Sequence, residues 1–128
     1  MAWDTAQFID LIFGVDGAPA NNQWITPGCS AISANEIRQT IPYACRLVRV
    51  DVMTQAAPGG GFTDTYTVHL NGAPTAAVVN IADPAQLDNW AGAAVAYAAG
   101  SEISIQFTTT GATSAVDIAV LLRFQVVK

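Results

Sequence analysis

Three segments in the second half of the chain alternate apolar with polar or small residues, and turn-forming residues bound each of them. They are residues 65–70 (TYTVHL), 102–107 (EISIQF) and 116–127 (VDIAVLLRFQVV), with Asn71-Gly72, Gly100 and Gly111 at their ends. Period-two alternation sends one set of side chains into a core and the other toward solvent or a partner, which indicates strands rather than helices. The chain is therefore predicted to be an all-β protein of about eight strands, with a two-sheet sandwich, a jelly roll or an immunoglobulin-like fold open at this point.

Residues 45–53 (CRLVRVDVM) form the clearest strand of the first half. The face predicted to enter the core consists of Val48, Val50 and Val52. The other face mixes opposite charges with large apolar groups, and the second face of the last strand does the same. Such faces suit a subunit interface, with an ordinary solvated face as the alternative. The predicted interface residues are Leu47, Arg49, Met53, Leu121 and Arg123.

Four segments are less regular. Residues 7–13 (QFIDLIF) are apolar on both faces, as expected of a strand covered on both sides or of an arm on a neighbouring subunit. Residues 14–28 are rich in Gly, Pro and Asn and are predicted to be turns and loop. Residues 33–41 fit either a helix start with Ser33 as N-cap or a short strand. In residues 83–90 (DPAQLDNW), a proline after an acid predicts a short helical turn capped by Asp83.

The composition limits the possible partners. The 128 residues fit one domain, and only 12% of them are charged, against about 25% in ordinary chains. A chain with so few charges is expected to bury part of its surface against another subunit. Ten acidic and five basic residues give a net charge of −5, so no basic stripe is available for nucleic acid or anionic lipid.

Neither a membrane span nor a secretory signal is expected. No run of eighteen apolar residues is present, and the residues after Met1 lack the basic region that opens a signal peptide. Synthesis and folding in a cytoplasm are therefore expected.

Groups that carry catalysis or hold metals are sparse. Cys29 and Cys45 are the only cysteines and form no zinc pattern, so they are predicted to be buried thiols, with a disulfide formed after release from the cell as the alternative. His69 is the only histidine, and no GxSxG elbow accompanies it, so it is predicted to be a surface residue of a strand. No enzymatic activity, metal or cofactor is expected.

Residues 83–90 also allow a binding hypothesis. Acid, amide and indole side chains are the groups with which a sugar pocket makes hydrogen bonds and stacks on rings. This segment supplies them as Asp83, Asp88, Asn89 and Trp90. The alternative is structural, with Asp83 in a turn and Trp90 closing the end of the sandwich.

From Ile41 to Val127 the chain follows a fixed order of signals. The positions that carry it are Ile41-Pro42, Pro58-Gly59, Tyr66 to Gly72, Ala99-Gly100-Ser101 and Thr108 to Gly111. This order resembles a family of small phage and prophage virion proteins with a jelly-roll domain, and TNF- and C1q-like domains share much of it. The resemblance covers about two thirds of the chain; the first forty residues and DPAQLDNW depart from it.

The resemblance implies one antiparallel two-sheet jelly roll over residues 1–128, with residues 1–30 as an N-terminal strand or arm and loop. It also implies a homotrimer in a virion that is assembled in the host cytoplasm, in contact with other virion proteins such as the major capsid protein. A compact capsid decoration protein is the expected function. The alternative is a receptor- or glycan-binding head domain of a phage fibre or tail tip. No contact with nucleic acid or membrane is expected.

Overall fold

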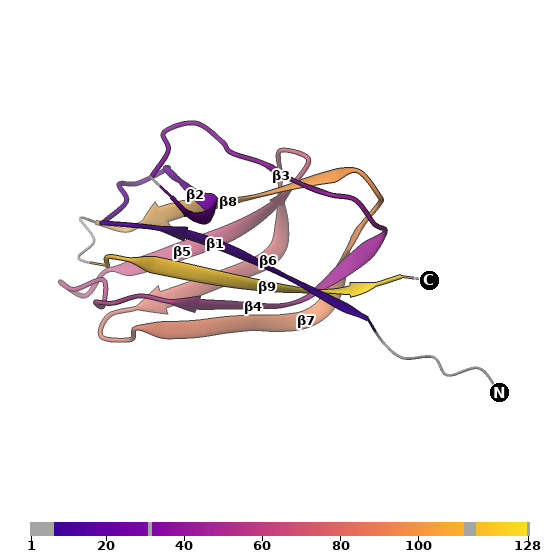
Figure 1. The fold of residues 1–128 in the computed structure, drawn as a ribbon. Coiled ribbons are helices and arrows are strands. Elements are labelled where there is room, and N and C mark those ends of the chain that lie inside the picture. The colour runs from indigo at the N-terminus through magenta and orange to yellow at the C-terminus, as the bar shows by residue number, and fades with distance from the viewer. Residues whose placement is uncertain (1–6, 31, 112–114, 128) are drawn as a thin grey trace.

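The computed structural model describes residues 7–30, 32–111 and 115–127, which form an all-β sandwich (Figure 1). Its strands are β1 (Phe8–Val15), β2 (Trp24–Ser30), β3 (Gln39–Ile41), β4 (Cys45–Met53), β5 (Thr63–Leu70), β6 (Ala73–Ala82), β7 (Leu87–Tyr97), β8 (Ser101–Thr109) and β9 (Ile118–Val126). These described ranges contain no helix. The predicted all-β class is confirmed.

The strand order is that of a jelly roll. Sheet A contains β1, β9, β4 and β7 in that order, and sheet B contains β6, β5 and β8, with β3 and the start of β2 paired to β8. From β3 onward the chain crosses between the sheets at every connection except the β5–β6 hairpin, and the first and last strands meet in sheet A. This is the arrangement of two Greek keys folded into a jelly roll. The end of β2 pairs in parallel with β1 and thereby joins the two sheets.

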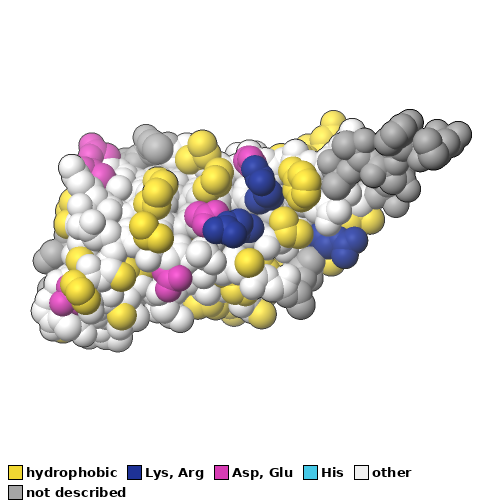
Figure 2. Space-filling model, turned by 90° about the horizontal axis from the view of Figure 1, so that it is seen from below, with side chains coloured by type: hydrophobic (Ala, Val, Ile, Leu, Met, Phe, Trp, Pro, Cys, Tyr) yellow, Lys and Arg dark blue, Asp and Glu magenta, His cyan; other side chains and the backbone are white. Residues whose placement is uncertain are grey.

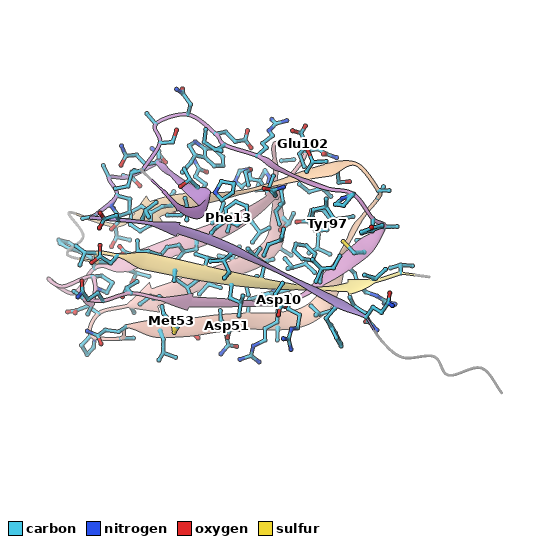
Figure 3. The ribbon with its side chains drawn as sticks, in the orientation of Figure 1. Asp10, Phe13, Asp51, Met53, Tyr97 and Glu102 are labelled. Carbon is cyan, nitrogen blue, oxygen red and sulfur yellow. The ribbon has the colours of Figure 1, made fainter. Side chains whose placement is uncertain are left out.

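The core lies between the sheets, where the alternating apolar residues meet. Phe107, Ile105, Leu122 and Phe124 are fully buried, as their period-two spacing predicts. Two edge-to-face aromatic pairs fill the space, Tyr66 with Phe107 and Tyr97 with Phe124. Figure 3 shows Phe13 and Tyr97 inside the sandwich, whereas Met53 and Asp51 project from sheet A.

The hairpin between β5 and β6 turns at the predicted pair. Asn71 and Gly72 both have positive φ, 50° and 85°, as a type I′ turn requires. The Asn71 side chain also accepts a hydrogen bond from the Glu102 N–H at 2.8 Å, which fixes the turn against β8.

A β-bulge in β4 makes the predicted orientation of Leu47 and Val48 wrong. Between Leu47 and Arg49, β4 carries one residue more than β9, which passes directly from Phe124 to Arg123. The extra residue, Val48, is only partly buried, and Leu47 turns into the core and is fully buried. Beyond the bulge the predicted alternation holds, with Val50 and Val52 buried.

Three local predictions change for identifiable reasons. The predicted loop of residues 14–28 ends early, because β2 begins at Trp24 and buries Ile25 completely. The helix alternative for residues 33–41 is wrong and the short strand β3 is present, since the Ser33 backbone pairs with Trp24 rather than capping a helix. The helical turn at residues 83–90 is also wrong, and the second half of that segment starts β7.

The start of β2 and the chain between β2 and β3 cover the outer side of sheet B. Glu36 accepts a hydrogen bond from the Ser104 hydroxyl at 2.6 Å, and the Trp24 ring meets the His69 ring edge-on at 5.0 Å. His69 and Ser104, which the alternation places outside, are therefore buried. The predicted surface position of His69 is wrong because simple alternation takes no account of a covering segment.

Candidate functional site

The outer side of sheet A is bare and mixes charge with large apolar groups (Figure 2). We call it the mixed face and define it by the outward side chains Phe8, Asp10 and Ile12 of β1, Leu121 and Arg123 of β9, Arg49, Asp51 and Met53 of β4, and Leu87 of β7. These residues come from four strands that are distant in the sequence. Only the jelly-roll connections bring them together.

A row of charges crosses the middle of the mixed face. Asp10 lies opposite Arg123, and Arg123 lies opposite Arg49. Arg123 holds Asp10 through two hydrogen bonds, Nε–Oδ1 at 2.9 Å and Nη2–Oδ2 at 3.0 Å, and Arg49 Nε contacts the Asp51 carboxylate at 2.8 Å. The hydrogen bonds and charge of Arg123 lower the pKa of Asp10. Both arginines are thus neutralised within one protomer, so a partner can cover them without burying an unpaired charge.

Apolar side chains flank this row on both sides. Phe8, Ile12, Met53 and Leu87 are 52%, 56%, 55% and 66% exposed, and all four belong to the mixed face. Arg123 also lies over the Phe8 ring, with Cζ 5.5 Å from the ring centroid. Several large exposed apolar groups on one bare sheet face are typical of interaction surfaces on soluble proteins.

The mixed face differs in charge from the rest of the molecule. Three of the four arginines, Arg46, Arg49 and Arg123, lie on the outer side of sheet A, while Arg38 pairs with Glu36 and Glu102 beside sheet B. The whole chain carries a net charge of −5. The mixed face is therefore electrically balanced on an otherwise acidic protein.

The structure brings together four of the five predicted interface residues. Arg49, Met53, Leu121 and Arg123 lie on neighbouring strands of the mixed face. Leu47 does not belong there, because the bulge buries it in the core. Sequence reasoning missed Phe8, Ile12 and Leu87, whose membership depends on strand order; the only sequence signal was the second apolar face of residues 7–13.

The four residues of the glycan hypothesis do not form one pocket. Asn89 and Trp90 are adjacent in β7 and so point to opposite sides of sheet A; Trp90 is partly buried against the core. Asp88 accepts a hydrogen bond from the Asn89 N–H. Asp83 binds the glycine-rich loop, accepting hydrogen bonds from Gly59 N at 3.2 Å and Gly61 N at 3.1 Å.

Replacing Asp83 tests its structural role. We expect Asp83→Ala to lower the free energy of unfolding by about 1–2 kcal/mol, because two loop N–H groups lose their acceptor. Asp83→Asn retains one side-chain oxygen and should lose about half as much. Urea unfolding followed by tryptophan fluorescence measures both, and equal stability of all three proteins would show that Asp83 does not hold the loop.

Among the described residues, the remaining titratable groups are not assembled into a reactive site. Neither ring nitrogen of His69 has a hydrogen-bond partner in the described part of the chain. No group of three or more His, Cys, Asp or Glu residues in the described ranges is placed to hold a metal ion. Cys45 is a free, buried thiol whose pKa is raised by burial, while the side chain of Cys29 lies outside the description. Within the described residues, no helix is long and apolar enough to cross a membrane.

Comparison of the chain with models of known protein families and with curated proteins found no match.

Proposed function

We propose that this protein is a structural component of a phage virion, a homotrimeric capsid decoration protein that acts through contacts with its own copies and with the major capsid protein. The observation that carries the proposal is the mixed face, a bare sheet with large apolar residues around internally paired charges. The jelly-roll fold and the order of turns and strands from Ile41 to Val127 support the same function. The glycan-binding alternative has no comparable support, because its four residues are dispersed.

The trimer is expected to use the mixed face. Its apolar residues gain free energy when a neighbour removes them from water, at about 25 cal/mol per Å² of apolar area. The paired arginines bring no uncompensated charge into the contact. Association is then favourable although the protein as a whole is acidic.

Light scattering of the isolated protein tests this proposal, and we expect a mass that is a multiple of three protomers. Leu121→Asp places an unpaired acid at the middle of the mixed face, and because an uncompensated buried charge costs about 3–5 kcal/mol, the threefold contact should weaken at least about 100-fold. The control is Ile37→Asp, since Ile37 is an exposed aliphatic residue that lies away from the mixed face, in the segment between β2 and β3.

Circular dichroism should show that both variants keep their strands. A wild-type protein that is monomeric at every concentration, or a Leu121→Asp variant that keeps the threefold mass, would contradict the trimer. Electron microscopy of intact phage particles tests the place of the protein in the virion, where an outer-surface density that fits this jelly roll is expected.

A further inference from the structure

One edge of sheet A has backbone hydrogen-bonding groups that face no strand of the described residues. Val126 N–H donates to the carbonyl of Gln7 at 2.8 Å. Gln7, and every second residue after it in β1, therefore directs its backbone N–H and C=O toward β9. In an antiparallel ladder, residues that bond to one neighbour alternate with residues whose N–H and C=O point the other way. Phe8 and Asp10 therefore direct both backbone groups away from β9, toward the free edge of β1, and Ile12 directs its N–H the same way, while the Ile12 carbonyl lies at the start of the β1–β2 ladder.

Strand β2 covers this edge only at its far end. Its parallel pairing with β1 begins at Phe13, and no other strand of the described chain pairs with β1 on that side. Burial changes at the same point. Phe13 is fully buried, whereas Ile9 and Leu11, which point inward on the same side of β1, are only partly buried against the core. An added strand at this edge would complete both the hydrogen bonding and the burial.

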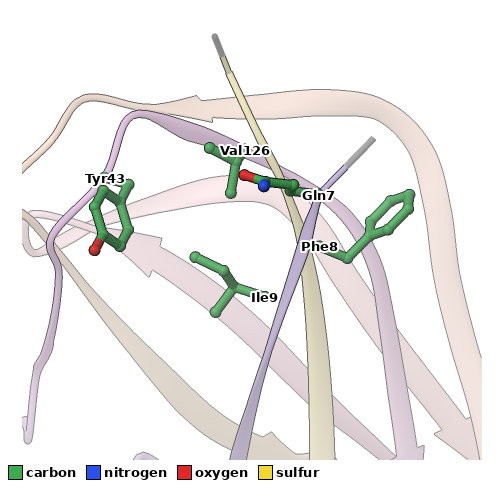
Figure 4. Close-up of a pocket in the computed structure, with 5 residues that line it drawn as sticks. All are labelled: Gln7, Phe8, Ile9, Tyr43 and Val126. Atoms are coloured by element: carbon green, nitrogen blue, oxygen red, sulfur yellow. The ribbon is translucent and has the colours of Figure 1, made fainter. Parts of the chain in front are cut away.

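The start of β1 also borders a hollow of about 540 Å³ lined by Gln7, Phe8, Ile9, Tyr43 and Val126. Figure 4 shows Ile9 and Tyr43 on one side of β1 and Phe8 on the other. The hollow leaves room beside Ile9 for an apolar side chain from a neighbour.

We propose that the free edge of β1 pairs antiparallel with the same edge of a second copy of this chain. Residues 8–12 read Phe-Ile-Asp-Leu-Ile, a pattern with the same character in both directions around Asp10. A twofold axis at Asp10 sets Phe8 opposite the partner's Ile12 and Ile9 opposite the partner's Leu11. Every apolar side chain of the edge then meets an apolar side chain, on both faces of the joined sheet.

The acid at the centre is compatible with this pairing. Two aspartates meet at the axis, and like charges opposite each other disfavour a strand pair. Each Asp10, however, is already held by Nε and Nη2 of its own Arg123, so the axis carries two neutral pairs rather than two free acids. The edge contact is made by the main chain of β1 together with Ile9 and Leu11, so it can form without the threefold contact of the proposed function, although Phe8 and Ile12 also belong to the mixed face.

Light scattering separates the two contacts. In Leu121→Asp, which removes the threefold contact, we expect dimers. In the Leu121→Asp background, Ile12→Pro removes an N–H that faces the edge but none that bonds to β9, so this double variant should be monomeric. The control is Ile12→Ala in the same background, which shortens the same side chain but keeps the N–H and should leave dimers. Monomers of Leu121→Asp, or dimers that tolerate the proline, would overturn the edge contact.

If Leu121→Asp keeps the threefold contact, Ile12→Pro in the wild-type background should still halve the mass; an unchanged mass would overturn the edge contact alone.

Oxidative crosslinking tests the register. The two Asp10 positions form a hydrogen-bonded pair, with Cα atoms about 5.5 Å apart, which is within disulfide range. Asp10→Cys should therefore give a covalent dimer under mild oxidation. Phe8→Cys should not, because each Phe8 lies opposite Ile12 of the other copy. Crosslinking of Phe8→Cys, or none of Asp10→Cys beyond the wild-type level, would contradict the twofold axis at Asp10.

Discussion

Between pH 10 and pH 12 we expect the free energy of unfolding to fall by about 5 kcal/mol, because Tyr66 and Tyr97 stay neutral in the core. Their side chains are almost completely buried, and this burial raises the pKa of both phenols well above the usual range. In the unfolded chain, tyrosine loses its proton above about pH 10. The unfolded state then binds fewer protons than the native state, so stability falls as pH rises, by about 1.4 kcal/mol per pH unit for each tyrosine.

Urea unfolding at a series of pH values measures this fall, and the double variant Tyr66→Phe/Tyr97→Phe is its control. Neither hydroxyl has a hydrogen-bond partner among the described residues, so the phenylalanines should cost at most about 1 kcal/mol at pH 7. The variant should lose most of the pH dependence between pH 10 and 12. The buried Cys45 thiol is the same in both proteins, so it does not affect the comparison. Equal pH profiles would show that the tyrosines ionise in the folded protein.

Leu47→Ala should destabilise the protein by about 2–5 kcal/mol, as deletion of a fully buried leucine does elsewhere. The bulge in β4 turns Leu47 into the core, opposite Phe124 of β9 and Val95 of β7. The loss includes the transfer of the leucine side chain to water and the cavity that remains between the sheets. Chemical unfolding in urea measures it directly.

Leu87→Ala is the matched control, since Leu87 lies on the mixed face and is 66% exposed. In dilute solution it should change the stability of the protomer by no more than about 0.5 kcal/mol. If the two leucines had similar effects, Leu47 would lie on the surface that simple alternation assigns to it, and the bulge would be absent.

The strands with uninterrupted alternation were predictable, and the reason is physical. In β8 the inward residues from Ile103 to Phe107, and in β9 those from Ile118 to Phe124, are large and apolar, so only one register buries them all. Alternation fails at a β-bulge, as at Val48. The extra residue reverses which side chains point into the core, and the amino-acid sequence gives no clear signal of it. It also fails at His69, where a distant segment covers an outward side chain.

The mixed face was predictable only in part for a related reason. Arg49 and Arg123 were found because each sits on a strand whose second face is mixed. Their adjacency, and the addition of Phe8 and Leu87, follow from the order of strands in sheet A, which is set by long-range pairing. Asp83 was assigned to a helix cap or a sugar pocket because its partners, Gly59 and Gly61, lie more than twenty residues earlier.

Strand β2 bonds to β8 through Trp24 and Ile25, and to β1 through its last three residues, so one strand belongs to both sheets. The layers cannot slide or separate on this side without breaking main-chain hydrogen bonds. Across the molecule, β6 and β7 lie in contact, but no ladder joins them among the described residues. We therefore expect thermal opening of the sandwich to begin on the β6–β7 side, with β2 as the hinge that holds the two sheets together.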